Sequence, residues 1–361
     1  MNRWFWLMAI PMLLAGCSQE PEESGFAGLA DIQQTGSEIP FLQPGLGDRL
    51  RFPEDFGPHP QHRIEWWYLT ANLETADGDP LGVQWTQFRQ ALTPRPAEAE
   101  APAASAWPLQ AAWMAHGAIS WRGQHVFAER LARADIGHAG AVAQPLEVWL
   151  DDWRLFRTDA EGAWRLQVVA DTWSYDLRLR LQGEPVAHGD HGFSAKSASG
   201  EGSMYFSLVD IGIDGTVTLD GQVLSVSGKG WFDREWSSQL LKTGQQGWDW
   251  FALHLASDDK LMAFQLREEE GGFVAGTWIP DQGEAVALSA ADLTLTPVSG
   301  SGATPTRWRI TLPRYGVDLE VQAPPGDYRN QGQYPYWESP VSVRGSHPGE
   351  GYMELTGYET D

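Results

Sequence analysis

Apolar and polar residues alternate with a period of two along much of this chain. LEVWLDDWRLF (Leu146–Phe156) and WSYDLRLRLQG (Trp173–Gly183) show the pattern. Such alternation places every second side chain on one face of a β-strand. Ile211–Gly228 adds Asp214-Gly215 and Asp220-Gly221 between alternating runs, and both dipeptides favour hairpin turns. We find no long, capped helical period. The sequence therefore predicts an all-β protein whose antiparallel strands form barrels.

A faint internal repeat points to two such units. Trp66–Arg89 resembles Trp248–Arg267, since each opens with aromatic residues, passes through an acidic turn and ends its second strand with arginine. The chain length of 361 residues suits two domains. We therefore expect one β-unit in each half of the chain.

The N-terminus matches a bacterial lipoprotein signal over residues 1–16. Arg3 supplies a positive charge, Trp4–Leu14 is a short apolar run, and Leu14-Ala15-Gly16-Cys17 has lipobox spacing. We expect lipidation of Cys17, a flexible tether over residues 17–47, and membrane contact through the acyl chains. Ser18 favours sorting to the outer membrane of the bacterial cell envelope, facing the periplasm. An ordinary signal peptide with an incidental cysteine is the alternative.

Charge and cysteine content narrow the possible partners and the sources of stability. The formal net charge is −23, which disfavours nucleic acid as a partner. Cys17 is the only cysteine, so the chain forms no internal disulfide. Packing must then hold the fold together.

Charged residues lie among aromatic residues in HRIEWWYL (His62–Leu69), GWFDREW (Gly230–Trp236) and GWDWF (Gly247–Phe251). In a strand, Asp233 and Glu235 point to one face, opposite to the arginine between them. Two carboxylates beside tryptophans can shift apart in pKa and act as an acid/base pair. Equally, such groups form ion pairs at a joint between barrels.

The sharper hypothesis places Glu65, Asp233, Glu235 and Asp249 in one aromatic-lined cleft between the domains. The aromatic side chains would bury an apolar ligand there. In the alternative, each acid binds an arginine such as Arg63, Arg89, Arg234 or Arg267. The candidate catalytic residues are Asp233 and Glu235, and the candidate ligand-binding residues are Glu65, Trp66, Trp67, Tyr68, Trp231, Arg234, Trp236, Trp248, Asp249 and Trp250.

Other chemistries find less support in the sequence. His59/His62 and His188/His191 form two histidine pairs that lack the further ligands a zinc site needs, so we interpret them as surface-loop histidines and predict no metal and no cofactor. No Gly-x-Ser-x-Gly elbow or phosphate-binding loop occurs. Glu338 and Glu354 are interpreted as structural, because strand alternation explains them.

Six motifs, in order, resemble the CrtC/AttH-like lipocalin-like family over about residues 50–361. They are HRIEWWYLTANL, YFSLVDIGIDGTV, GWFDREWSSQ, GWDWFALHL, YWESPVSV and GYMELTGY. The family includes carotenoid 1,2-hydratases and secreted proteins encoded beside ABC transporters. The resemblance implies two tandem lipocalin- or calycin-like barrels, over residues 48–237 and 238–361. The hydratases carry a histidine-rich motif at the segment that is Asp233–Trp236 in this chain. Arg234 and Glu235 differ from that motif.

The leading functional hypothesis is a periplasm-exposed lipoprotein that binds an apolar or amphipathic small molecule, such as a lipid or isoprenoid. The family resemblance alone implies an ABC transporter permease as its partner. The alternative is a hydratase- or hydrolase-type enzyme on an apolar substrate, with Asp233 or Glu235 as the acid. A third hypothesis is a structural protein with filled barrels. A cavity of several hundred Å³ would distinguish the first two from the third.

Overall fold

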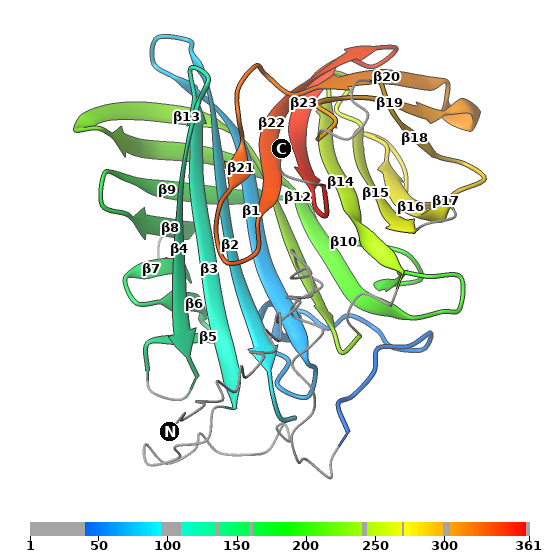
Figure 1. The fold of residues 1–361 in the computed structure, drawn as a ribbon, viewed down its shortest axis with the longest axis horizontal. Coiled ribbons are helices and arrows are strands. Elements are labelled where there is room, and N and C mark those ends of the chain that lie inside the picture. Colours follow the sequence, from blue (N-terminus) through cyan, green and yellow to red (C-terminus); the bar gives the residue numbers. More distant parts are fainter. Residues whose placement is uncertain are drawn as a thin grey trace, which may run out of the picture.

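A computed structural model describes residues 40–94, 110–134, 137–158, 162–239, 244–268, 271–298 and 304–358. The predicted signal segment, the lipidation site at Cys17 and the predicted tether before residue 40 lie outside the described residues. Within those ranges, no helix has the length and apolar character needed to cross a membrane. The described strands form two antiparallel sheets that lie side by side (Figure 1).

The first sheet has 13 strands and curves into a nearly closed barrel (Figure 1). Its order is β4-β3-β2-β1-β13-β12-β9-β8-β7-β6-β5, and the short strands β10 and β11 pair with β12. A 3-10 turn, η2 (Glu54–Phe56), precedes the first strand. The strands are β1 (Ile64–Thr75), β2 (Pro80–Ala91), β3 (Ala111–Trp121), β4 (Gln124–Arg133), β5 (Ala139–Ala143), β6 (Leu146–Leu150), β7 (Trp153–Arg157), β8 (Trp164–Val169), β9 (Trp173–Gln182), β10 (Val186–Ala187), β11 (Phe193–Ala195), β12 (Gly202–Leu219) and β13 (Gln222–Ser237).

The second sheet has 10 strands and forms a half-barrel. Its order is β17-β16-β15-β14-β23-β22-β20-β19-β18, with β21 paired to β22. A 3-10 turn, η3 (Pro313–Tyr315), joins β19 to β20. The strands are β14 (Gln245–Leu255), β15 (Lys260–Glu268), β16 (Gly272–Ile279), β17 (Val286–Ser289), β18 (Thr294–Pro297), β19 (Arg307–Leu312), β20 (Val317–Gln322), β21 (Arg329–Asn330), β22 (Tyr336–Gly345) and β23 (Gly349–Leu355). The predicted all-β fold of two tandem lipocalin-like barrels is confirmed in this arrangement.

One of the two predicted hairpin turns is wrong. Asp220-Gly221 does join β12 to β13, but Asp214-Gly215 lies inside β12, which runs without interruption to Leu219. Asp214 forms an ion pair with Arg180 on the neighbouring strand. A Cβ on Gly215 would lie 2.2 Å from the Asp176 carbonyl oxygen of that strand. The glycine is therefore needed for close strand approach and not for a turn.

Each sheet curves around its own packed core. Trp67, Trp85 and Trp153 are fully buried inside the first barrel. Trp308 and Phe251 are equally buried inside the half-barrel, where their rings pack edge to face. Large aromatic side chains bury much apolar surface and account for a large part of the stability of such a core. Side chains thus fill the inner faces, and the outer faces of β1, β12, β13 and β14 remain available to form a joint.

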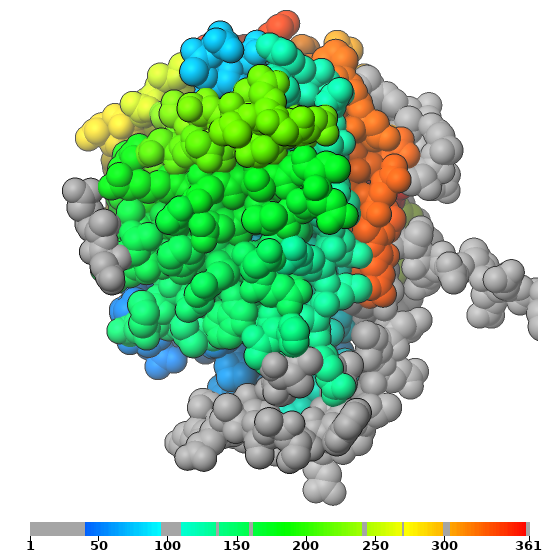
Figure 2. All heavy atoms as spheres, turned by 90° about the vertical axis from the view of Figure 1, so that its left-hand side faces the viewer, coloured from blue at the N-terminus to red at the C-terminus, as the bar shows by residue number. Residues whose placement is uncertain are grey.

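An aromatic joint connects the two sheets. Asn72 donates from its Nδ2 to the Gly351 carbonyl oxygen at 3.0 Å, between β1 and β23. The segment from β21 into β22 lies along β3 and β4, and Figure 2 shows it in orange beside the outer wall of the first barrel. The buried apolar members of the joint include Tyr68, Tyr205, Val209, Trp231, Trp250, Met262, Phe264 and Tyr352.

Candidate active site between the two sheets

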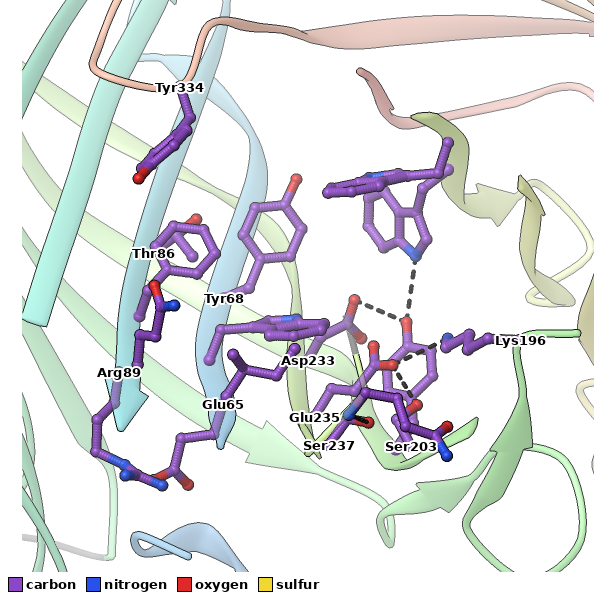
Figure 3. Close-up of a pocket in the computed structure, with 18 of the residues that line it drawn as sticks. Glu65, Tyr68, Thr86, Arg89, Lys196, Ser203, Asp233, Glu235, Ser237 and Tyr334 are labelled. Carbon is purple, nitrogen blue, oxygen red and sulfur yellow. Dashed lines mark hydrogen bonds and ion pairs between the residues drawn. The ribbon is translucent and has the colours of Figure 1, made fainter. Parts of the chain in front are cut away.

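A cavity of about 350 Å³ lies within this joint (Figure 3). Strands β1, β2, β3, β4, β12 and β13 of the first sheet line it, together with β14, β15, β22 and β23 of the second. A volume of this size accommodates a small molecule, and aromatic walls favour an apolar one. The aromatic lining includes Trp66, Tyr68, Phe88, Trp248, Trp250 and Phe264.

Strand β13 presents its two acids to this cavity. Asp233 and Glu235 both line it, whereas Arg234 points to the opposite face of the strand, into the first barrel. Across β1, Tyr68 is the register partner of Asp233, and Trp66 is that of Glu235. The period-two geometry of paired strands therefore brings aromatic and acidic side chains to one wall.

Asp233 is held in an enclosed polar pocket in that wall. The Trp231 indole donates to its Oδ1 at 2.7 Å, the Tyr205 hydroxyl donates to its Oδ2 at 2.9 Å, and the Ser207 hydroxyl also donates to Oδ1. Burial raises the pKa of Asp233 to about 7, although these hydrogen bonds act in the opposite direction. Near neutral pH the carboxyl group is thus poised to donate or accept a proton.

Glu235 is paired with a lysine that the sequence analysis did not select. Its Oε1 lies 2.9 Å from the Nζ of Lys196, and the Ser203 hydroxyl donates to the same oxygen. Lys196 belongs to the segment between β11 and β12, and Figure 3 shows it pointing toward the two acids. An ion pair therefore lies among the aromatic residues that line the cavity.

Two further acids, interpreted as structural from the sequence, approach the cavity from the second sheet. Glu338 and Glu354 are directly opposite each other on β22 and β23. The Tyr68 hydroxyl bonds to Glu338, and Glu354 accepts a hydrogen bond from the Trp248 indole. Burial raises the pKa of Glu354 to about 7, and nearby Asp233 adds to the effect. The YWES and YMEL segments repeat the aromatic-acid pattern of the selected motifs, which was the available signal.

A hydrogen-bonded chain continues from these acids toward the surface. The Tyr336 hydroxyl bonds to Glu338 and lies 3.0 Å from the Nδ1 of His116. The other ring nitrogen of His116 is 2.9 Å from Glu129, which is partly exposed. Burial lowers the pKa of His116, so its ring is neutral at physiological pH. The chain links protonatable groups of both sheets, from the cavity wall to solvent.

Glu65 and Asp249 instead follow the arginine-binding alternative. Glu65 forms ion pairs with Arg89 and Arg234, and although burial would raise its pKa, the two guanidinium groups hold it well below the usual range. Asp249 lies outside the cavity lining, 3.3 Å from Arg267. Burial raises the pKa of Asp249 to about 6 despite that arginine. The two sheets thus share a pattern: an acid on β1 or β14 pairs with an arginine near the end of the next strand, β2 or β15.

The candidate ligand-binding residues divide between the cavity and its surroundings. Five of them line the cavity, namely Glu65, Trp66, Tyr68, Trp248 and Trp250. The other five, Trp67, Trp231, Arg234, Trp236 and Asp249, lie outside the lining. Trp67 is in the barrel core beneath Arg234, Trp231 supports Asp233 from within the joint, and Trp236 stacks on His59 with ring centroids 3.7 Å apart. Trp67 and Arg234 do not reach this cavity, because alternation along their strands directs both side chains into the core.

The interpretation of the histidines as surface-loop residues is wrong for two of them. His188 is fully buried, and its ring nitrogens lie 2.6 Å from the Ser207 hydroxyl and 2.8 Å from the Thr277 hydroxyl. It thereby connects the first sheet to the second. His62 is 7% exposed, and burial lowers its pKa to about 4.

The raised pKa of Asp233 predicts how stability depends on pH. The folded state keeps this proton up to about pH 7, while the unfolded chain releases it near 3.8. The folded state binds more protons between these values, so the free energy of unfolding falls as pH rises through them. Asp233→Asn removes this contribution. Urea unfolding should show the variant gaining roughly 4 kcal/mol relative to wild type between pH 4 and pH 8. A constant difference would contradict the raised pKa.

The fold and the cavity define a class of protein. It is an all-β protein of two tandem lipocalin-like units with an acid-containing aromatic cavity between them. The chain belongs to the AttH-like family, whose sequence pattern matches residues 43–358, so the resemblance stated from the motifs is confirmed. No curated protein sequence matches the chain.

Solved structures share the fold over most of the chain. A protein assigned as AttH from Nitrosomonas europaea is 29% identical, with a TM-score of 0.76, and covers 89% of this chain and 100% of its own. Kievitone hydratase from Nectria haematococca is 17% identical, with a TM-score of 0.62, over 90% of this chain and 99% of its own. CghA with Sch210972 is 14% identical, with a TM-score of 0.56, over 90% and 96%. The last two are similar in fold.

Proposed function

We propose that this protein binds an apolar or amphipathic small molecule in the cavity and adds water across one of its carbon–carbon double bonds. The observation that carries the proposal is a pair of carboxyl groups, Asp233 and Glu354, that enter one apolar cavity from different sheets. Each has a pKa of about 7, raised by burial. One can therefore be protonated while the other is ionised near neutral pH. The hydratase among the structures of this fold supports the choice of reaction.

In this reaction Asp233 is the general acid. Its carboxyl O–H gives the proton to one alkene carbon, and a carbocation forms at the other. The faces of Trp66, Trp248 and Trp250 in the lining would stabilise that positive charge. Ionised Asp233 keeps its hydrogen bonds from Trp231 and Tyr205, which stabilise the carboxylate that remains.

Glu354 is the general base in the second step. Its carboxylate takes a proton from water as the water oxygen bonds to the carbocation, so that H and OH are added in total. Glu354 ends protonated and Asp233 ionised, and proton exchange with solvent resets both. The chain through Tyr68, Glu338 and His116 offers a route for the proton of Glu354. Glu354 replaces Glu235 in this role, because Lys196 is paired with Glu235.

Oxygen-18 incorporation tests the reaction directly. Purified protein is incubated in H₂¹⁸O with a panel of isoprenoid alkenes, and products are analysed by mass spectrometry. We expect one panel member to gain one labelled water per turnover, at a rate proportional to protein concentration. Unlabelled recovery of every alkene, together with tight binding of at least one of them, would leave binding alone as the function.

Binding without chemistry is the second candidate function, and the aromatic lining favours it equally. Trp250→Ala should weaken binding of the fluorescent hydrocarbon diphenylhexatriene by about tenfold or more, because the indole forms part of the cavity wall. Trp149→Ala, on β6 of the barrel wall, is the matched control. Equal affinities in both variants would place the binding site elsewhere. Fluorescence titration measures both.

Localisation and partner remain proposals from the sequence. We propose that acylated Cys17 anchors the protein to the outer membrane, facing the periplasm, and that an ABC transporter permease is its partner. The lipobox supports the first proposal and the family resemblance the second. Palmitate labelling of wild type and Cys17→Ala tests the anchor, with loss of label and release from membranes expected for the variant.

A further inference from the structure

Lys196 brings a cation into the wall of an apolar cavity. Its Nζ lies 4.1 Å from the ring centroid of Phe264 and 5.1 Å from that of Tyr205. Phe264 belongs to the second sheet and Tyr205 to the first, so the ammonium group reaches the joint itself. The side chain is 26% exposed and lines the cavity. The cation is therefore accessible to a bound molecule while aromatic rings flank it.

The bonds of Lys196 leave donor capacity toward the cavity. An ammonium group carries three N–H donors. Glu235 Oε1 at 2.9 Å accepts from one of them, and the two nearby rings supply no oxygen acceptor for the others. Arg89 also lines the cavity, but its guanidinium is engaged by Glu65 and by the carbonyl oxygens of His59 and His62. Of these two cations, Lys196 is the one placed to meet a ligand.

Neutralising Glu235 is a simpler role for the lysine. Enclosing an ion pair costs desolvation, however, and a well-packed apolar pair of similar volume is often equally stable. The pair also stands where polar groups gather at one end of the cavity, with Ser197, Ser203 and Gln239 in the same lining. Trp66, Trp248 and Trp250 line the same cavity, so polar groups beside Lys196 and large apolar rings are offered to one ligand.

We propose, on the basis of the proposed function, that Lys196 binds an oxygen acceptor of the ligand. The ligand is then amphipathic, with a carboxylate or carbonyl oxygen beside Lys196, where Ser197 and Ser203 also line the cavity. Its apolar body lies against the tryptophans of β1 and β14. This arrangement orients the ligand, because only one end can form a charge-assisted hydrogen bond.

A matched pair of fluorescent probes tests the assignment. Diphenylhexatriene is a hydrocarbon, and its propionic acid derivative adds a carboxylate to the same body. Lys196→Met should weaken binding of the propionate by about tenfold or more, and should leave the affinity for the hydrocarbon within about twofold. Lys196→Arg should restore most of the loss. The methyl ester of the probe distinguishes a carbonyl ligand from a carboxylate ligand. If Lys196 binds a neutral carbonyl, Lys196→Met should weaken binding of the ester as much as binding of the propionate.

Two controls keep the test decisive. Lys229→Met removes an exposed lysine that pairs with Asp258, and should change neither affinity. In Lys196→Met the unpaired Glu235 would itself repel the propionate, so the double variant Lys196→Met/Glu235→Gln removes both charges. Continued weak binding of the propionate supports the proposal, whereas recovery of wild-type affinity means that the lysine only neutralises Glu235. If wild type does not bind the hydrocarbon, the result argues against the apolar cavity of the proposed function. Binding of the propionate that depends on Lys196 would still support Lys196 as the group that binds the ligand oxygen. Binding of neither probe overturns both.

Discussion

Asp233→Asn is expected to reduce turnover of the responding alkene by a factor of about 10² to 10⁴, while affinity for diphenylhexatriene stays within about twofold. Asparagine has nearly the same shape and can keep hydrogen bonds with Trp231 and Tyr205. It cannot transfer an acidic proton to carbon. Oxygen-18 incorporation measures the rate, and fluorescence titration measures binding.

The pH profile gives an independent check on Asp233. Turnover should fall as pH rises above about 7, because the general acid loses its proton there. Glu235→Gln is the comparison variant, since its carboxylate pairs with Lys196 and has no proton-transfer step in the proposed reaction. Near-normal turnover by Asp233→Asn, or a greater loss in Glu235→Gln, would assign the acid role to another group.

Arg234→Met is expected to lower the free energy of unfolding by about 3–5 kcal/mol. The guanidinium is fully buried, forms an ion pair with Glu65, donates to the Gly57 carbonyl oxygen at 2.5 Å and stacks 3.8 Å above the Trp67 ring. Methionine keeps much of the volume but leaves buried acceptors without their donors, which is costly. Urea unfolding at neutral pH measures the loss.

An exposed arginine provides the matched control for Arg234. Arg309 pairs with Asp318 at 2.7 Å, but both side chains are more than half exposed, so Arg309→Met should cost less than about 1 kcal/mol. The double variant Glu65→Gln/Arg234→Met should not recover the loss, because the buried Arg89 would then lack its carboxylate partner. A loss below about 1 kcal/mol in Arg234→Met would contradict a structural role for this ion-pair cluster.

Local pattern in the sequence predicted the strands and the orientation of side chains within them. Alternation placed Asp233 and Glu235 on one face of a strand, and the structure shows both at the cavity. Alternation does not reveal which face of a strand packs in the core, so the sequence makes Trp66 and Trp67 equal candidates, although only Trp66 lines the cavity. Asp214-Gly215 has the composition of a turn, yet strand pairing on both sides overrides it.

The remaining site residues converge only in three dimensions. Glu354 is far from Asp233 in the sequence, and its motif looks like ordinary strand alternation. Lys196 lies in a segment of small residues with no periodic signal, and its aromatic neighbours, Tyr205 and Phe264, come from different sheets. His188 shows the same limit, because its hydrogen bonds run to two different sheets. No local rule predicts such contacts between sheets.

The order of strands along the chain has a consequence for synthesis in the cell. Strand β1 is synthesised early, but one of its edges pairs with β13, and the bond between Glu65 and Arg234 joins residues 169 positions apart. Until β13 emerges from the ribosome, an aromatic strand edge stays open, and such edges promote aggregation. The cavity needs a still later segment, because Glu354 lies in the last strand. A stalled or truncated chain would thus expose an aggregation-prone strand edge and lack a complete cavity. Binding of a cavity probe would therefore report complete synthesis as well as folding.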